Sequence, residues 1–216
     1  MNKKQISKEI YEVLLNKYPS PKSALNFNNE VEVWASVILS AQCTDKRVNI
    51  VTKELFKKYK TFKDYKSSDI EDLKKIIHST GFFNSKAKYL KDGATILVDK
   101  YSSKLPKELK ELIKLPGVGR KVANVILSEQ FQINEGMAID THNKRVIHRI
   151  GLTNSKDPKV IEKEIVKIVD KKNWNTFSLL MIEHGRETCK AIKPRCKDCS
   201  ISKYCSFYRK NYIKKV

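Results

Sequence analysis

The chain has 216 residues, of which 40% are hydrophobic, so it is long enough to bury the core of one large domain or of two compact ones. Lys and Arg number 44 against 24 for Asp and Glu, a formal charge of +20, whose commonest use is attraction to a polyanion. Nucleic acid is therefore the leading partner, and lysine-rich solvated helix surfaces are the alternative. We expect no membrane association, because no apolar run approaches the ~20 residues of a spanning helix and the N-terminus lacks the apolar stretch of a signal peptide.

Apolar residues recur at spacings of three and four along most of the chain, and no convincing alternating pattern competes with them. The fold class predicted is therefore all-α, with Pro- and Gly-containing links between the helices. In chain order, the apolar faces and helical stretches lie at 6–14, 34–41, 48–55, 70–78, 85–98, 106–114, 120–131, 142–150, 158–170 and 174–184. Composition alone does not reveal a domain boundary.

The most informative segment is Leu115-Pro-Gly-Val-Gly-Arg-Lys121, which ends one helical pattern and opens another. Gly117 and Gly119 permit positive φ and close backbone approach. The turn can then direct N–H groups at a phosphate beside a helix N-terminus. The alternative for these residues alone is an ordinary turn between two helices with a glycine cap.

The helix after this turn governs how Lys121 is presented. Its periodicity predicts a buried face, made of Val122, Val125 and Ile126. Asn124 and Ser128 are predicted to share another face with Lys121, which would lie beside the turn and face solvent or a polyanion. A single lysine in so basic a chain is otherwise a solvated charge.

Residues Leu115 to Ala123 match the signature L-P-G-V-G-x-K-x-A, and in this the chain resembles the endonuclease III family of helix-hairpin-helix DNA glycosylases. The resemblance implies that Lys121 attacks C1′ of a damaged nucleotide and displaces the base. A Schiff base would follow, with β-elimination on the 3′ side. It also implies that Gly117, Gly119 and Arg120 contact DNA.

Asp140-Thr-His142 precedes a helical run that Gly151 closes, and from the residues alone Asp140 is an N-cap. The family motif V-D-T-H is present here as Ile139 to His142, so the resemblance carries the family's catalytic aspartate over to Asp140. We expect Asp140 both to cap the helix and to act in catalysis. A carboxylate near the developing sugar cation would stabilise positive charge. His142 is either a DNA-facing residue or part of the helix surface.

Four of the five cysteines form a C-x6-C-x2-C-x5-C pattern: Cys189, Cys196, Cys199 and Cys205. In a reducing compartment clustered thiols bind metal more often than they form disulfides. Four thiolates can hold either zinc or an iron-sulfur cubane. Zinc usually shows two close pairs, whereas only Cys196 and Cys199 are so spaced, and this favours iron-sulfur. Cys43 is predicted to be a small buried hydrophobe.

The cysteine pattern also resembles the cluster loop of the endonuclease III family, which binds a 4Fe-4S centre. Between the first two cysteines lies a short basic segment that contains Lys190, Lys193 and Arg195. The resemblance suggests that this loop contacts backbone phosphates, through Lys193 and Arg195 in particular.

A glycosylase must take its base out of the stack, which leaves a gap for a side chain to fill. Leu39-Ser-Ala-Gln42 resembles the family's L-S-A-Q and places Gln42 where a gap-filling residue is expected. Residues 81–87, G-F-F-N-S-K-A, resemble G-L-Y-N-S-K-A, with Phe82 where the family commonly has leucine. We expect Phe82 and Lys86 to contact DNA. A packed loop aromatic is the alternative for Phe82.

The resemblance covers nearly the whole chain and implies two modules: a six-helix module of residues 24–133, and a helical iron-sulfur module of 1–23 with 134–216. It implies a monomeric, nucleoid-associated cytoplasmic enzyme that acts on double-stranded DNA containing oxidised pyrimidines or abasic sites. The alternatives are a monofunctional mismatch glycosylase, which Lys121 argues against, and a noncatalytic hairpin module that only holds DNA.

Overall fold

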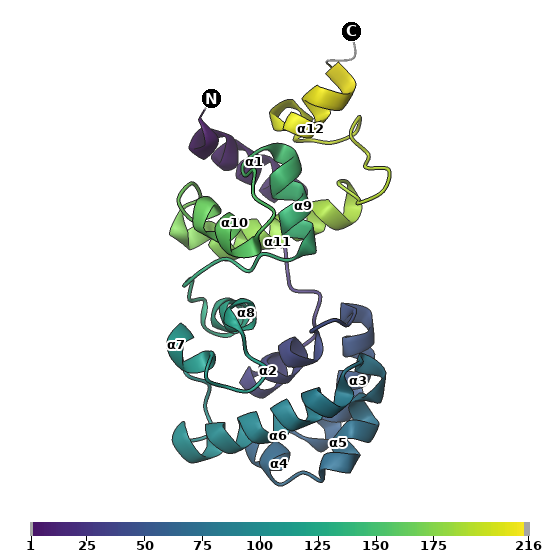
Figure 1. Cartoon of the computed structure of the whole chain (residues 1–216), viewed down its shortest axis with the longest axis vertical. Helices are drawn as coiled ribbons and strands as arrows, with labels where there is room; N and C mark the ends of the chain where they lie inside the picture. Colours follow the sequence, from purple (N-terminus) through teal and green to yellow (C-terminus); the bar gives the residue numbers. More distant parts are fainter. Residues whose placement is uncertain (1, 214–216) are drawn as a thin grey trace. The chain divides into compact units, whose positions relative to one another are not determined.

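The computed structural model describes residues 2–213, in which every regular element is helical and no strand occurs. The all-α prediction is thus confirmed. The chain divides into two compact units: unit 1 is Met1–Lys22 with Gly136–Val216, and unit 2 is Ser23–Glu135 (Figure 1). Met1 and residues 214–216, the ends of the predicted iron-sulfur module, lie outside the described residues.

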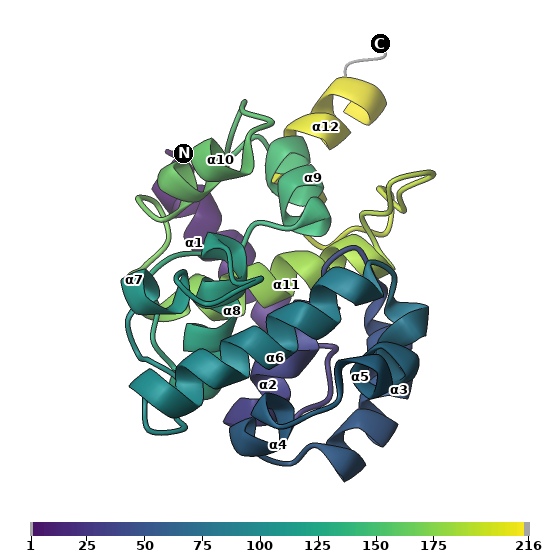
Figure 2. The ribbon, with the colours of Figure 1, turned by 60° about the horizontal axis from the view of Figure 1, so that its bottom comes forward.

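Unit 2 is built from seven α-helices and one 3-10 turn. They are α2 (Glu30–Leu39), α3 (Asp45–Lys58), α4 (Phe62–Lys66), α5 (Ile70–Ile77), η1 (His78–Thr80), α6 (Phe83–Lys100), α7 (Leu109–Leu112) and α8 (Arg120–Phe131). Within this unit α6 packs against both α4 and α5 (Figures 1 and 2). Side-chain caps at Asn29, Thr44 and Thr61 start α2, α3 and α4, as N-cap preferences predict.

The core of unit 2 is centred on Trp34, which is fully buried. Phe62 and Tyr65, both from the short helix α4, meet its ring edge-on at centroid distances of 5.4 and 5.6 Å. This geometry is favoured for aromatic pairs. Helix α4 was not predicted, because five residues are too few for a helical period to show.

Unit 1 is built around a hydrophobic core of its own, to which α1, α9, α10 and α11 each contribute buried residues. Its elements are α1 (Lys3–Lys17), α9 (Thr141–Ile150), α10 (Pro158–Ile165), η2 (Lys171–Asn173), α11 (Trp174–Glu187), η3 (Ser202–Tyr204), α12 (Ser206–Tyr208) and the π-helical η4 (Arg209–Ile213). Within it α9 packs on α11.

Two predicted helical stretches are shorter in the structure. The stretch predicted at 106–114 contains only α7, because Glu108 is still extended before the helix begins. The stretch predicted at 158–170 ends at Ile165, where the amides of Ile168 and Val169 both donate to the Ile165 carbonyl and turn the chain. Across residues 2–213, no helix combines the length and the apolar character needed to cross a bilayer.

Candidate functional site

The hairpin between α7 and α8 uses its two glycines differently. Gly117 has φ +75°, and a Cβ there would lie 2.7 Å from the Tyr89 ring, so both conformation and packing require glycine. Gly119 has φ −84°, so the prediction of a permitted positive φ applies only to Gly117. A Cβ on Gly119 would meet nothing within 4 Å. The space beside Gly119 is therefore open within the chain, and a ligand's backbone could approach closely there.

Helix α8 begins at this open position. Gly119 is its N-cap and has no side chain with which to accept from the amides of the first turn, so those N–H groups depend on other partners. Arg120 and Lys121 follow at once, and both are exposed. The positive end of the helix dipole and two cations meet there, an arrangement suited to a phosphate.

Lys121 is presented as predicted, but its helical neighbours are not. Its ammonium group forms no hydrogen bond or ion pair with any residue in 2–213. Asn124 and Ser128 are buried, with exposed fractions of 3% and 6%, so the prediction that they share an exposed face with Lys121 is wrong. The reason is tertiary: α8 packs against both α2 and α7, which leaves its first turn as the exposed part.

Asp140 is the N-cap of α9, as predicted from the residues alone. Its Oδ1 accepts from the backbone N–H of Asn143 at 2.7 Å and from Asn143 Nδ2 at 3.1 Å. Asn143 Nδ2 also donates to Ser178 Oγ, which itself donates to the Ala138 carbonyl. Within residues 2–213 nothing donates to Asp140 Oδ2. One carboxylate oxygen therefore fixes the helix start and the other is free for chemistry.

His142 lies in the contact between α9 and α11. Its Nδ1 is 3.1 Å from Arg145 Nη2, and a Cβ on Gly185 would come within 3.0 Å of the same ring nitrogen. Arg145 Nη2 also donates to the Gly185 carbonyl. The half-buried ring is thus held by packing, which supports the helix-surface alternative more than a DNA contact.

Gln42 and Phe82 share an unusual backbone conformation. Their φ angles are 52° and 48°, in the left-handed region that side-chain-bearing residues rarely adopt. Both residues are exposed, Phe82 to 65%, so the packed-loop alternative for Phe82 does not hold. Strain of this kind persists only where the surroundings impose it, and it concentrates at functional sites.

Lys86 requires a correction. It was predicted to contact DNA, but only 3% of the residue is exposed. Its Nζ donates to the backbone carbonyls of Leu39 and Thr80, each at 2.8 Å. Burial lowers the pKa of Lys86 from its ordinary value. The side chain of Lys86 is directed into unit 2, so a phosphate contact is excluded in this structure.

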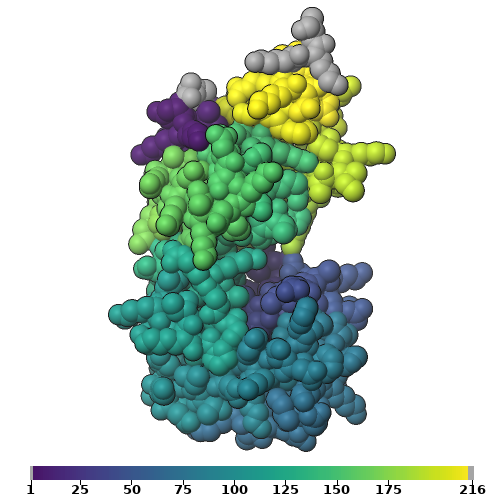
Figure 3. Space-filling view, viewed as in Figure 1, coloured from purple at the N-terminus to yellow at the C-terminus, as the bar shows by residue number. Residues whose placement is uncertain are grey.

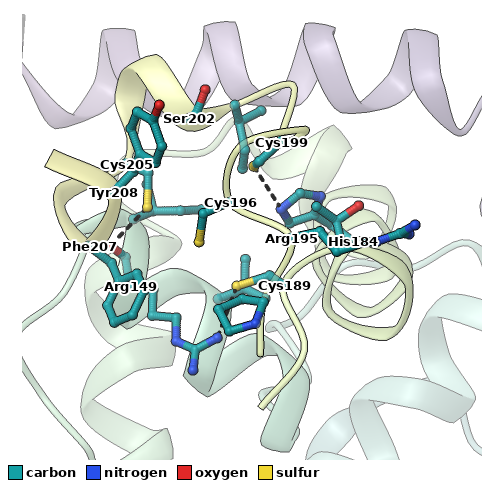
Figure 4. Close-up of a pocket in the computed structure, with 15 residues that line it drawn as sticks. Arg149, His184, Cys189, Arg195, Cys196, Cys199, Ser202, Cys205, Phe207 and Tyr208 are labelled. Atoms are coloured by element: carbon teal, nitrogen blue, oxygen red, sulfur yellow. Dashed lines mark hydrogen bonds between the residues drawn. The ribbon is translucent and has the colours of Figure 1, made fainter. Parts of the chain in front are cut away.

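The four cysteines of the C-terminal pattern line one hollow of about 360 Å³ in unit 1, part of it open to solvent. Figure 4 shows their sulfur atoms gathered around it. Hydrogen bonds orient three of them: Cys205 Sγ donates to the Arg149 carbonyl at 3.3 Å, Arg149 Nη1 lies 3.4 Å from Cys189 Sγ, and Cys199 Sγ lies 3.6 Å from His184 Nε2.

Burial is the main cause of the pKa shifts of the titratable side chains that line this hollow. It raises the pKa of the Cys199 thiol to about 11 and also raises the pKa of Cys205, with the neighbouring thiols adding to both. Burial, and then the charge of Lys17, lowers the pKa of His184 to about 4. The free thiols of Cys199 and Cys205 are therefore protonated at neutral pH, so a cationic metal centre would have to displace their protons.

The donor set is compatible with two kinds of metal centre. Among residues 2–213 no group of three or more His, Cys, Asp or Glu side chains is arranged to hold a metal ion. A single zinc ion needs its thiolates at about 2.3 Å, whereas a cubane keeps its ligands farther apart because its own atoms stand between them. The four thiols that line one hollow are the donor set that either kind of centre requires.

The loop between α11 and α12 protrudes from unit 1 (Figure 3). Arg149 supports it from α9 by donating to the Lys190 and Ala191 carbonyls at 2.7 and 3.0 Å. Lys193 is exposed with a left-handed φ of 49°. Arg195 is exposed, and its Nη2 donates to the Glu187 carbonyl at 2.8 Å. Sequence reasoning missed Arg149, whose one signal is its place in the last turn before a glycine cap.

An all-α chain with a Gly-Val-Gly hairpin before an exposed lysine defines a helix-hairpin-helix protein. Residues 35–171 match the family described as HhH-GPD superfamily base excision DNA repair protein. Endonuclease III of Rickettsia felis is 45% identical over 98% of this chain and 99% of its own length. A solved non-covalent endonuclease III–DNA complex matches with a TM-score of 0.91 and 38% identity over 99% of this chain and 100% of that one. A trapped covalent endonuclease III–DNA intermediate gives 0.90 and 38% over 97% and 98%.

The chain therefore belongs to the endonuclease III family. It is a base excision repair enzyme that acts on DNA, a DNA glycosylase with abasic-site lyase activity. The resemblance recognised in the sequence is confirmed, and the noncatalytic alternative is rejected.

Proposed function

We propose that Lys121 is the nucleophile of this enzyme and that oxidised pyrimidines are its substrates. The observation that carries the proposal is the exposed ammonium of Lys121, without a partner in residues 2–213, in the first turn of a helix whose N-cap has no side chain. Phosphate held at that turn would bring a nucleotide's sugar beside the amine.

The reaction proposed has three steps. The neutral amine of Lys121 forms a bond to C1′ while the glycosidic bond breaks, and the base leaves with that electron pair and takes up a proton. The sugar ring then opens as nitrogen loses its proton, which gives a Schiff base. Loss of a proton from C2′ finally expels the 3′ phosphate and breaks the C3′–O bond.

Asp140 is proposed as the carboxylate of this reaction. Its Oδ1 is occupied by Asn143, so its position is fixed, and Oδ2 is free to stabilise a sugar cation or to move a proton. A carboxylate held in advance costs no reorganisation during the reaction. The capping role and the catalytic role are thus divided between the two oxygens of one side chain.

Cys189, Cys196, Cys199 and Cys205 are proposed to hold a 4Fe-4S cluster, because all four line one hollow and their sequence pattern resembles the cluster loop of the family. Such a cluster supplies a rigid cross-link and one-electron redox chemistry when bound. In this chain Arg149 and His184 orient two of the thiols and would orient them as ligands.

DNA contacts are proposed for the turn and for the exposed loops. Backbone N–H groups at Gly117 and Gly119, with Arg120, would bind phosphate, as would Lys193 and Arg195. Gln42 and Phe82 would enter the stack when a base is extruded. The protein would then be found with the nucleoid in the cytoplasm, where its substrate lies.

The test is reductive trapping on duplex DNA that carries an abasic site. Borohydride should reduce the Schiff base and leave wild-type protein joined to DNA, whereas Lys121→Gln should bind the DNA without forming an adduct. Lys114→Gln, at a neighbouring exposed lysine before the hairpin, is the matched control and should trap normally. Trapping by Lys121→Gln at the wild-type level would show that another amine is the nucleophile. Excision from an A:G mismatch without any adduct would indicate the monofunctional alternative.

A further inference from the structure

The loops that carry Gln42 and Phe82 are 40 residues apart in the sequence, yet one side chain of the same unit reaches the backbone beside both. Lys86 Nζ donates to the carbonyl of Leu39, the last residue of α2, and to the carbonyl of Thr80, the last residue of η1. Gln42 follows the first of these by three residues, and Phe82 follows the second by two.

We propose that Lys86 is a positioning residue, a buried clamp that holds the Gln42 and Phe82 loops in one fixed arrangement for base extrusion. The inference rests on the proposed role of these two residues in extrusion and adds the element that fixes them. No phosphate contact by Lys86 is involved.

The physical reason lies in the ends of α2 and η1. The last carbonyls of a helix have no partner within it, and a cation near them is stabilised by the helix dipole. At the end of α2, the carbonyls of Ser36, Val37 and Ile38 accept from Ser40 or Ala41. The next carbonyl, that of Leu39, accepts from Lys86.

The same lysine is tied to the second loop by its own backbone. The backbone N–H of Lys86 donates to the Phe82 carbonyl at 3.1 Å. The backbone of Lys86 is thus bonded to Phe82, while its side chain is bonded to Thr80. Gly81 and Phe82, between these points, both have left-handed φ angles, 69° and 48°. Glycine adopts such an angle freely, but at Phe82 the angle is strained and needs surroundings that impose it, and Lys86 supplies part of them.

A buried ammonium is costly unless its donors are satisfied, so one that is 3% exposed and bonded to two carbonyls indicates a specific structural use. The helix offers a direct comparison. Lys91, also on α6, donates through Nζ to one carbonyl, that of Ser68, at 2.6 Å. It touches neither loop, so it provides the matched control.

The test compares Lys86→Met with Lys91→Met by hydrogen exchange and by kinetics. Methionine keeps the apolar stem and removes the donor. In Lys86→Met the amides of residues 40–43 and 80–83 should exchange together about tenfold faster, the scale of an unsatisfied buried acceptor. Base excision from a stable duplex should fall about tenfold, whereas lyase cleavage of a preformed abasic site should stay within about twofold, because only excision needs a stable wedge. Lys91→Met should leave both loops and the excision-to-lyase ratio unchanged.

Lys86→Arg covers the case in which Lys86→Met folds poorly, because arginine retains a cation with several donors, and it should restore protection partly in both loops at once. Equal loosening of the loops by Lys86→Met and Lys91→Met, or recovery of one loop alone in Lys86→Arg, would overturn the clamp. Loosening with an unchanged excision-to-lyase ratio would overturn its link to extrusion. Failure of the proposed function is distinct, since it would appear as wild-type protein that traps no DNA.

Discussion

The exposed loops of the two units are held in place by different chemistry. In unit 2 one buried ammonium, that of Lys86, satisfies carbonyls beside two loops. In unit 1 the loop between α11 and α12 is held by Arg149 and by four cysteines that line a hollow. In unit 2 a single lysine is enough to hold both loops, because each loop follows a helix that already packs on an aromatic core. The cysteine loop buries Ile201 and Tyr204 in the unit 1 core, and its four cysteines would order the rest of it when they bind a metal centre.

The catalytic residues proposed differ in a parallel way. Lys121 has no bonding partner in residues 2–213 and contributes nothing visible to folding. Asp140 caps α9 and is tied through Asn143 to Ser178. A substitution of Lys121, in unit 2, should therefore change the chemistry and leave stability unchanged. A substitution of Asp140, in unit 1, can change both.

The largest effect is expected from loss of a cluster ligand. Wild-type protein purified anaerobically should be brown and carry about four iron atoms per chain. Cys199→Ser should lose iron and, with it, several kcal/mol of stability, the scale of structural metal sites. Iron analysis, visible absorption and hydrogen exchange would measure this, with protection lost in unit 1 and kept in unit 2.

The matched control is Cys43→Ser, the same substitution in unit 2. Cys43 was predicted to be buried but is only half-buried beside the unit 2 core, and its replacement should leave the iron content unchanged. Stoichiometric zinc in wild-type protein, or full iron in Cys199→Ser, would contradict the contrast between the units.

A smaller effect is expected at Asp140. Asp140→Asn keeps an oxygen that can accept from Asn143 N, so the cap should survive, because Asn and Asp are equivalent N-caps. Base excision should still fall by about 10²- to 10⁴-fold from loss of the charge. Single-turnover excision rates and melting curves would be measured together.

Asp140→Ala then separates the two roles. It should show the same loss of rate and a further loss of about 0.5–2 kcal/mol in stability, because the cap is also gone. Lys121→Gln should melt like wild type. Equal melting temperatures for Asp140→Ala and Asp140→Asn would mean that the cap contributes nothing measurable.

The smallest effect is expected at Arg149. Arg149→Met removes the donors to the Lys190 and Ala191 carbonyls, which lie in an exposed segment and can turn to water, and the donor to Cys189 Sγ, so iron content is measured alongside. Affinity for undamaged duplex should fall only about 3- to 10-fold, the value of one or two modest hydrogen bonds. Arg209→Met removes the same charge from an exposed site outside this loop and serves as the control. An identical loss in both variants would mean that charge alone, and not the loop, is responsible.

Much of this enzyme could be predicted from local patterns. Helical periodicity identified most helices, Asp140 was recognised as a cap, and the segment from Leu115 to Ala123 was enough to suggest the family. These features depend on residues within a turn or two of one another. The local residues of such a motif determine its backbone geometry, so the motif can be recognised without knowing how the rest of the chain packs.

The roles of Lys86, Asn124 and Ser128 were decided only by the tertiary structure. Each looks polar and exposed in the sequence, and each is buried because a distant segment covers it: the ends of α2 and η1 around Lys86, and the neighbours of α8 around the other two. Helix α4 was missed because five residues show no period, although its aromatic side chains pack on Trp34. Local sequence determines the course of the backbone, whereas burial depends on which remote elements pack together, and in Lys86 that packing converts a basic surface residue into an internal support.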